Sequence, residues 1–207
     1  MKLWAGRFQK ETDTLVNTFN SSIDFDARLY KQDITGSIAH ATMLGEQGVI
    51  TMEEAQDIIQ GLQAILQDIE DGKVEVSMEN EDIHMNIEAL LTQRIGDAGK
   101  KIHSGRSRND QVLVDMHLYV RDELLHIRRG VRTLFDRLIA LSEQYKEVLL
   151  PGYTHLQVAM PSSFGLWFGA YAESLVDDVY LLNAAYRIAD QNPLGSAAGY
   201  GFPSIAR

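Results

Sequence analysis

The stretch that decides the fold runs from residue 112 to residue 150 and reads VLVDMHLYVRDELLHIRRGVRTLFDRLIALSEQYKEVLL. Apolar residues recur in it at alternating steps of four and three: Val120, Leu124, Ile127, Val131, Leu134, Leu138, Leu141, Tyr145 and Val148. This spacing puts them on one face of a single α-helix and is typical of a bundle or coiled-coil seam. A helix of that length, roughly 60 Å at about 1.5 Å per residue, must pack against other helices.

A second long helix follows this one. Pro151 ends the first helix, PGYTHLQVAM (151–160) is predicted to be a loop at one end of the bundle, and Pro161 is well placed to begin the next helix. That helix continues a similar apolar stripe through Phe164, Phe168, Tyr171, Leu175, Val179, Leu182 and Tyr186. Because two helices cannot close a bundle, we infer that further helices come from other subunits, from a separate chain or from sequence that has been lost.

Shorter helices precede residue 110. Thr51 and Glu54 form a capping box before an apolar face at 55–69, and further helices are expected around 29–44 and over 83–95. Strand signals are almost absent. The sequence therefore predicts an all-α protein with an amino-terminal helical domain (1–109) and the start of a central long-helix bundle (110–207), which is incomplete.

Composition excludes several functions. The formal net charge of −10 opposes nucleic-acid binding, and the absence of cysteine rules out disulfides and thiolate metal sites. No apolar run is long enough to cross a bilayer, and the first ten residues do not have the pattern of an export signal. We expect a cytoplasmic protein that binds neither membrane nor nucleic acid.

The segment HSGRSRND (103–110) is a candidate anion site. Arg106 and Arg108 lie beside two hydroxyls and an amide, immediately before the longest helix, where first-turn N–H groups favour a carboxylate or phosphate. Asn109 or Asp110 can cap the helix. The alternative is a purely structural helix start whose arginines pair with surface acids.

The segment PGYTHLQ (151–157) places His155 beside Thr154 on a connection bracketed by prolines. A histidine there can act as acid or base near neutral pH. The alternative is a histidine that only hydrogen-bonds to backbone.

The segment ENEDIHMNIE (79–88) crowds acids and His84 onto a helix start, where acids are favourable by themselves. Glu81 with His84, and Glu123 with His126, also have the Glu-x-x-His spacing of di-iron bundles. His126 is turned away from the apolar seam of its helix, so we predict no metal site.

Taken together, these segments closely resemble the argininosuccinate lyases of the fumarase and aspartase superfamily, over nearly the whole chain. The strings that carry the resemblance are LWAGRF (3–8), FNSSIDFDARLY (19–30), DITGSIAHATML (33–44), EDIH (81–84), HSGRSRNDQV (103–112), PGYTHLQ (151–157) and PLGSAAG (193–199). GRSRNDQ and GYTHLQ are the most specific of them. The resemblance identifies the chain as the amino-terminal portion of such an enzyme.

The resemblance implies cleavage of argininosuccinate to arginine and fumarate by anti elimination, in arginine biosynthesis, without metal or organic cofactor. It implies a proton-transfer role for His155, and substrate contacts for Ser22, Asp82, His84, Ser107, Arg108, Asn109 and Thr154. It also implies a homotetramer in which three subunits build each active site. Adenylosuccinate cleavage is a neighbouring alternative in the superfamily, but GRSRNDQ argues against it.

Departures from the family pattern are mild at Ala5, Ser104 and Met160. The serine-bearing loop of the family, thought to take part in proton transfer, has no counterpart before the end at Arg207. We therefore expect the 207-residue chain to be inactive or nearly so by itself. A catalytically silent helical oligomerisation module remains the alternative.

Overall fold

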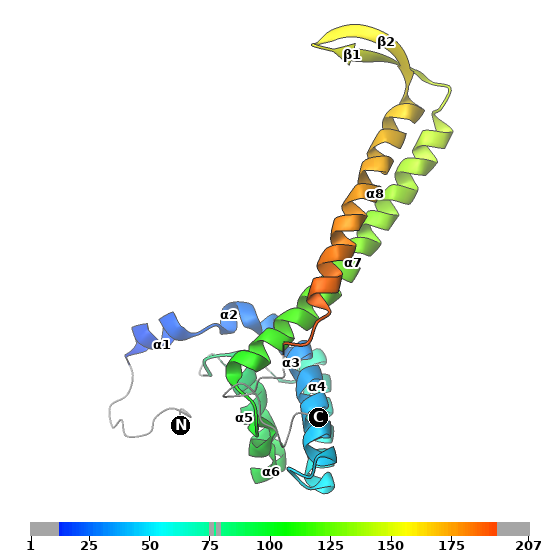
Figure 1. Cartoon of the computed structure of the whole chain (residues 1–207). Coiled ribbons are helices and arrows are strands. Elements are labelled where there is room, and N and C mark those ends of the chain that lie inside the picture. Colours follow the sequence, from blue (N-terminus) through cyan, green and yellow to red (C-terminus); the bar gives the residue numbers. More distant parts are fainter. Residues whose placement is uncertain (1–12, 75–76, 78–79, 194–207) are drawn as a thin grey trace. The chain divides into compact units, whose positions relative to one another are not determined.

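A computed structural model describes residues 13–74, 77 and 80–193 of the chain (Figure 1). Helices dominate these residues, as the sequence predicts. In chain order the elements are α1 (Thr14–Asn20), α2 (Ile23–Asp26), the 3-10 turn η1 (Ala27–Leu29), α3 (Tyr30–Glu46), α4 (Met52–Glu70), α5 (Ile83–Ile95), α6 (Asp97–Lys100), η2 (Lys101–His103), α7 (Arg108–Gln144), β1 (Leu149–Thr154), β2 (Gln157–Ser163) and α8 (Phe164–Ala189).

Two compact units divide the described residues. The first unit extends to Met116 and also takes in the end of the described chain from Asn192, and His117–Gln191 form the second unit. The start of α7 belongs to the first unit and the rest of this helix to the second.

The first unit has a conventional apolar core between α3, α4 and α5. Its most deeply buried aliphatic side chains are Ile34, Leu44, Ile58, Leu62, Ile65, Ile83, Ile87 and Leu91. The predicted capping box is confirmed at the start of α4, because Thr51 accepts from the Glu54 N–H and Glu54 accepts from the Thr51 N–H. The expected helices around 29–44 and over 83–95 are confirmed as α3 and α5.

The second unit is an antiparallel pair of long helices with a β-hairpin between them (Figure 1). At one end of the pair, Nδ1 of His117 lies 3.0 Å from the Ala189 carbonyl oxygen. At the other end, the Ser142 hydroxyl donates to the Gly165 carbonyl oxygen over 2.7 Å. Contacts at both ends show that α7 and α8 stay together along the unit.

The connection between the long helices corrects three expectations. The first helix ends at Gln144 and not at Leu150, and residues 151–160 form most of an antiparallel hairpin and not a loop. Pro161 lies in β2, so it does not begin the next helix. That helix begins at Phe164, where the Ser163 hydroxyl accepts from the Leu166 N–H over 3.1 Å. Ser163, two residues after Pro161, caps the helix, so the preference of proline for the first helical position does not set the start of α8 here.

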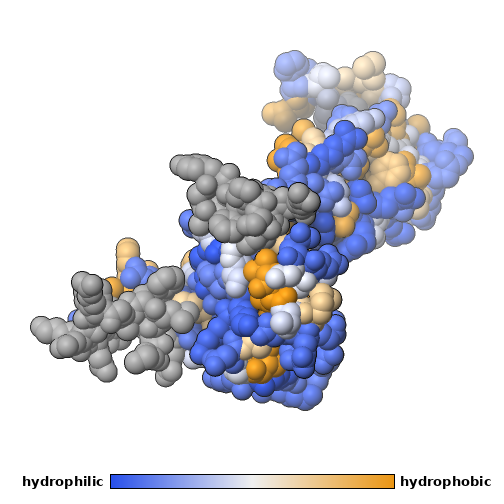
Figure 2. All heavy atoms as spheres, turned by 60° about the horizontal axis from the view of Figure 1, so that its bottom comes forward, coloured by the Kyte–Doolittle hydropathy of each residue, from blue (hydrophilic) through white to orange (hydrophobic). Residues whose placement is uncertain are grey.

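The apolar stripe of the second unit is poorly covered. In this unit Gly165 and Ala172 are the only residues classed as buried, whereas Ile127 and Leu134 on the predicted seam are 48% and 51% exposed. Figure 2 shows such apolar side chains in orange at the surface, among hydrophilic ones. The described helices include none that is long and apolar enough to cross a membrane. The helix pair therefore presents apolar faces that it does not itself cover.

The backbone of the second unit is tightly packed around Gly165. A Cβ atom at this position would lie 2.5 Å from the Lys146 Cα and 2.6 Å from the Ser142 carbonyl oxygen, which are backbone atoms that cannot yield easily. We expect Gly165→Ala to lower the free energy of unfolding by about 1–3 kcal/mol, measured by urea denaturation followed by circular dichroism. The matched control is Gly130→Ala in α7, where an added Cβ meets nothing within 4 Å. The control should be neutral or stabilising by up to about 1 kcal/mol; equal losses in the two variants would contradict this packing.

Candidate functional site

The start of α7 places the candidate anion-binding residues. Ser107 immediately precedes the helix, and its hydroxyl accepts from the Asn109 N–H over 3.3 Å. Ser107 therefore caps the helix, and the expectation that Asn109 or Asp110 would do so is wrong. The reason is that the helix already begins at Arg108, so Asn109 and Asp110 lie within its first turn.

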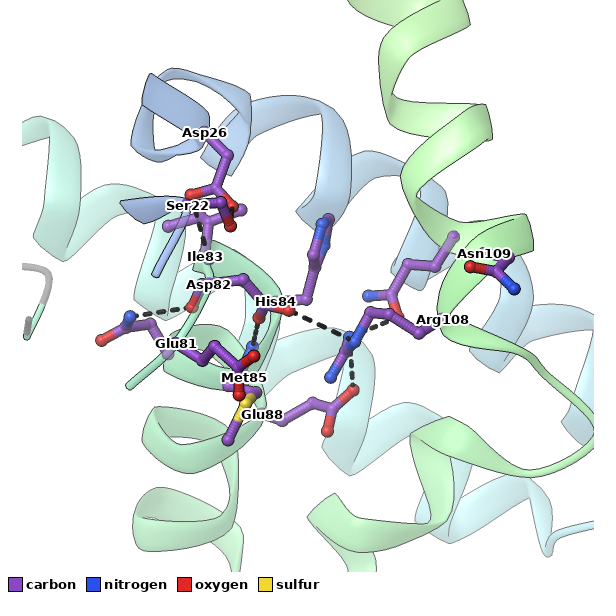
Figure 3. A network of polar contacts seen from close by, with 12 residues as sticks. Ser22, Asp26, Glu81, Asp82, Ile83, His84, Met85, Glu88, Arg108 and Asn109 are labelled. Atoms are coloured by element: carbon purple, nitrogen blue, oxygen red, sulfur yellow. Dashed lines mark hydrogen bonds and ion pairs between the residues drawn. The ribbon is translucent and has the colours of Figure 1, made fainter. Parts of the chain in front are cut away.

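Arg108 is held in a frame of polar groups (Figure 3). Its Nη1 donates to Gln111 Oε1 over 2.6 Å and to Glu88 Oε1 over 3.1 Å, and its Nε lies 3.6 Å from Asp82 Oδ2. The Asn109 side chain is exposed and points away from this frame. The frame fixes the direction of the guanidinium fork, which is the geometry that planar recognition of a carboxylate requires.

Glu88 stays ionised within this frame. Its burial favours the neutral acid, but the hydrogen bond from His103 and the charge of Arg108 outweigh burial and lower the pKa of Glu88 below its usual value. His103 Nδ1 lies 3.1 Å from the same Glu88 oxygen that Arg108 contacts. A negative ligand arriving at Arg108 would therefore meet a cation that already has an acidic partner.

Asp82 and Ser22 lie beside the frame, at the start of α5 and before α2. Asp82 caps α5 by accepting from the Met85 N–H over 2.6 Å. The Ser22 hydroxyl donates to Asp26 over 2.5 Å, and Asp26 also accepts from the Ile83 N–H over 3.2 Å. Burial raises the pKa of Asp26, and the bond from Ser22 offsets only part of that rise. This network ties α2 to the first turn of α5.

His84 is the centre of a buried polar cluster that we name the His84 cluster: His84, Asp33, Arg106, Gln111 and Asp115. The Nδ1 of His84 lies 2.9 Å from Asp33 Oδ1 and 3.3 Å from Asp115 Oδ2. Gln111 donates to the same Asp33 oxygen over 2.5 Å. All five side chains are buried, so the cluster links α3, α5 and the start of α7 away from water.

The pKa values of the two acids in the His84 cluster are shifted in opposite directions. Burial favours protonated Asp33, but the hydrogen bond and charge of His84, the charge of Arg106 and the bond from Gln111 together lower the pKa of Asp33. Burial, with the neighbouring charge of Asp33, raises the pKa of Asp115 to about 9. At neutral pH the cluster therefore contains an Asp33 carboxylate and a neutral Asp115 carboxyl.

The donor set of the His84 cluster is also the one group of described residues that could hold a metal ion, through Asp33, His84 and Asp115. The buried guanidinium of Arg106 already supplies a positive charge to both acids. The Glu-x-x-His pairs of the sequence do not form this group: His126 and Glu123 are exposed on α7. The described residues therefore give no support to a di-iron site.

The second candidate position is the turn of the β-hairpin. Thr154 pairs with Gln157, and the two residues between them, His155 and Leu156, have φ angles of 50° and 64°. Positive φ at both central positions defines a type I′ turn, which normally needs Asn and Gly. Side chains rarely adopt this conformation, and a strained turn of this kind is common at functional sites. The turn presents His155 as an exposed ring at the tip of the hairpin.

The predicted site residues thus fall into two groups. The first unit brings together Ser22, Asp82, His84, Ser107 and Arg108, with Asn109 exposed beside them. Thr154 and His155 belong to the second unit.

Sequence reasoning missed the residues that orient this site, namely Asp33, Glu88, Gln111 and Asp115. Each sits inside a helix, where an acid or amide is usually a solvated surface residue. The one available signal was that Asp33 and Asp115 interrupt otherwise apolar helix faces.

Comparisons with known proteins identify the class to which this fold and site belong. A family described as Lyase matches residues 6–207, so the chain belongs to this lyase family. More specifically, the chain is 54% identical over 205 residues to the argininosuccinate lyase of Desulforamulus reducens, and 52% identical over 200 residues to that of Bacteroides thetaiotaomicron. These alignments cover 98% and 97% of this chain but 45% of either relative, so the chain spans less than half of their length.

A solved structure shares the fold. The structure of an EDDS lyase variant with bound fumarate matches with a TM-score of 0.76 and 27% sequence identity. The match covers 88% of this chain and 35% of that protein.

The opposite pKa shifts of the two acids in the His84 cluster predict that the same substitution costs much more stability at Asp33 than at Asp115. Asp33→Asn removes the charge that Arg106 and His84 need, and should lower the free energy of unfolding by about 3–5 kcal/mol at neutral pH. Asp115→Asn replaces a neutral carboxyl by an amide of the same shape, and should cost about 1 kcal/mol or less. Urea denaturation of both variants measures the difference. A larger loss for Asp115→Asn would show that the charge lies on Asp115.

His40 makes the free energy of unfolding depend on pH. Its Nε2 donates to the Ser104 carbonyl oxygen over 2.9 Å. Burial and the charge of Arg106 lower the pKa of His40 from 6.5 to about 4. Because the unfolded chain takes up this proton at higher pH than the folded chain, stability is lost as pH falls from 6.5 toward 4. His40→Gln keeps a donor but removes the titration. We expect the free energy of unfolding of the wild type, relative to this variant, to fall by about 2 kcal/mol between pH 7 and pH 5. A flat difference would contradict the assignment.

Proposed function

We propose that this chain is part of an argininosuccinate lyase, a carbon–nitrogen lyase that cleaves argininosuccinate to arginine and fumarate by anti elimination. The observation that carries the proposal is the 54% identity to an argininosuccinate lyase across 98% of the chain. The fumarate bound in the structurally similar EDDS lyase variant supports a product of the same kind.

The chemistry of the proposed reaction fits the residues. A proton must leave a carbon next to a carboxylate, so the site needs a base, and positive donors where the carboxylate gains charge. We assign carboxylate binding to Arg108, whose fork is oriented by Gln111 and Glu88. We assign proton transfer to His155 and hydrogen bonding to substrate to Thr154. Ser22, Asp82, His84, Ser107 and Asn109 complete the proposed substrate contacts.

The proposal includes a homotetramer in the cytoplasm, in which several subunits contribute residues to each active site. The exposed apolar stripe on α7 and α8 supports an assembly, because isolated helix pairs do not leave such faces open to water. The family's serine loop would also be required for proton transfer. We therefore propose that the 207-residue chain does not catalyse the reaction by itself.

A second candidate function is a catalytically silent helical oligomerisation module. The same exposed stripe on α7 and α8 favours it, because it provides an assembly surface without requiring chemistry. The two functions differ in whether argininosuccinate contacts Arg108 and His155.

Fumarate release from argininosuccinate, followed by ultraviolet absorbance, tests the proposal. We expect no release by the chain alone. We expect release when the chain is refolded with a fragment of the Desulforamulus reducens relative that supplies the remainder of that protein. His155→Asn in this chain should reduce the restored activity by at least about 100-fold, because general acid–base groups contribute about 10²–10⁴-fold.

His117→Asn is the matched control, because this ring contacts the Ala189 carbonyl within the helix pair and is not among the proposed site residues. It should leave most of the restored activity. A folded mixture of the two fragments without activity would favour the silent module. Equal losses in the two histidine variants would contradict the role of His155.

A further inference from the structure

The geometry around His84 distinguishes the two nitrogens of its ring. The Nδ1 lies 2.9 Å from Asp33 Oδ1, a hydrogen-bonding distance, and 3.3 Å from Asp115 Oδ2. The side chains of His84, Asp33 and Asp115 are 2% exposed or less, so water does not compete for these contacts. The Nδ1 edge of the imidazole ring therefore contacts the carboxyl oxygens of Asp33 and Asp115.

The charges that face the ring come from several elements. Asp33 lies on α3, Asp115 on α7, and Arg106 in the segment before α7; the charge of Asp26 on α2 also acts on the ring. Arg106 lends its charge to both Asp33 and Asp115, and Gln111 donates a second hydrogen bond to Asp33. A carboxylate supported in this way stays an acceptor, and so requires a proton on the nitrogen that faces it.

We propose that Asp33 is a positioning residue that keeps a proton on Nδ1 of His84, which leaves Nε2 as the bare nitrogen of the ring and the one available for the proposed contact with substrate. This inference rests on the proposed function for the part that concerns substrate. Asp33 does not touch substrate itself; it selects the tautomer and the orientation of His84, which is one of the proposed substrate contacts. The same arrangement of a carboxylate behind a working imidazole is general in enzymes.

The two buried acids do not share this role equally. Asp33 Oδ1 receives hydrogen bonds from both His84 and Gln111, whereas the side chain of Asp115 forms its hydrogen bond with Asp33. Asp33 is therefore the acceptor that orients the ring, and Asp115 is a neighbour that hydrogen-bonds to Asp33. This difference makes Asp115 the matched control for Asp33.

A divalent cation is the competing occupant of this cluster. It would bind Nδ1 and carboxyl oxygens in place of the proton. The Arg106 guanidinium argues against a bound cation, because it already supplies positive charge to Asp33 and Asp115. A metal ion in the same buried cluster would be repelled by this guanidinium without further acids to balance the charge. The two alternatives differ at Nδ1: it carries a proton if Asp33 positions the ring, and it binds the metal if a cation occupies the cluster.

Long-range ¹H–¹⁵N correlation spectra of the histidine-labelled 207-residue chain test the proposal, with the His84 signals assigned by loss in His84→Gln. We expect the wild type to show the Nδ1-protonated pattern at mildly alkaline pH. Asp33→Asn should shift the pattern toward the Nε2-protonated form. Asp115→Asn, and Asp26→Asn on the neighbouring helix, should leave it unchanged.

A wild-type spectrum with Nε2 protonated and Nδ1 bare overturns the proposal, and so does an unchanged tautomer in a folded Asp33→Asn chain. Stoichiometric broadening of the His84 signals by Mn²⁺ also overturns it in favour of a cation site. The wild-type spectrum decides the tautomer even where a variant does not fold. The measurement needs no turnover, so failure of the fumarate assay is a separate result that concerns only the proposed function.

Discussion

An ionised carboxylate with no access to water needs hydrogen-bond donors, and Asp33 Oδ1 finds them on separate parts of the chain. His84 on α5 and Gln111 on α7 both donate to its Oδ1, and Arg106 from the segment before α7 supplies charge. The alignment of α3, α5 and the first turns of α7 depends on this arrangement. If one of these helices moved, a buried charge would lose its partners, which is among the most destabilising changes a protein can undergo.

The proposed substrate site is built on that arrangement. Gln111 uses its amide nitrogen on Asp33 and its amide oxygen on Arg108, so one side chain connects the buried charge to the guanidinium at the edge of the site. His84 sits between Asp82, which caps its helix, and the acids behind it. The anion-binding side chains are therefore oriented by groups that do not themselves face a ligand. Such preorganisation removes part of the entropic cost of binding.

The second unit follows a different constraint. Its helices are tied at both ends by polar contacts and approach closely at Gly165, yet the apolar seam between residues 120 and 148 remains largely exposed. At its far end, the tight turn through His155 and Leu156 is held in a backbone conformation that both side chains disfavour. A rigid pair of helices with a strained tip is suited to presenting one side chain accurately, provided that other helices cover the pair.

The sequence by itself determined the longer helices and the motifs that indicate the family, although the ends of α7 and the start of α8 differ from the prediction. These are local features: the period of apolar residues, the Thr51–Glu54 capping box and strings such as GRSRNDQ depend on neighbours within one or two turns. The hairpin at 149–163 escaped prediction because short strands that contain prolines carry no periodic signal, and pairing between them gains stability only once they meet. The roles of Asp33, Gln111 and Asp115 were decided only by the tertiary structure. A buried acid looks like a surface acid in the sequence, and its pKa and partners are set by residues that are 50 to 80 positions away in the chain.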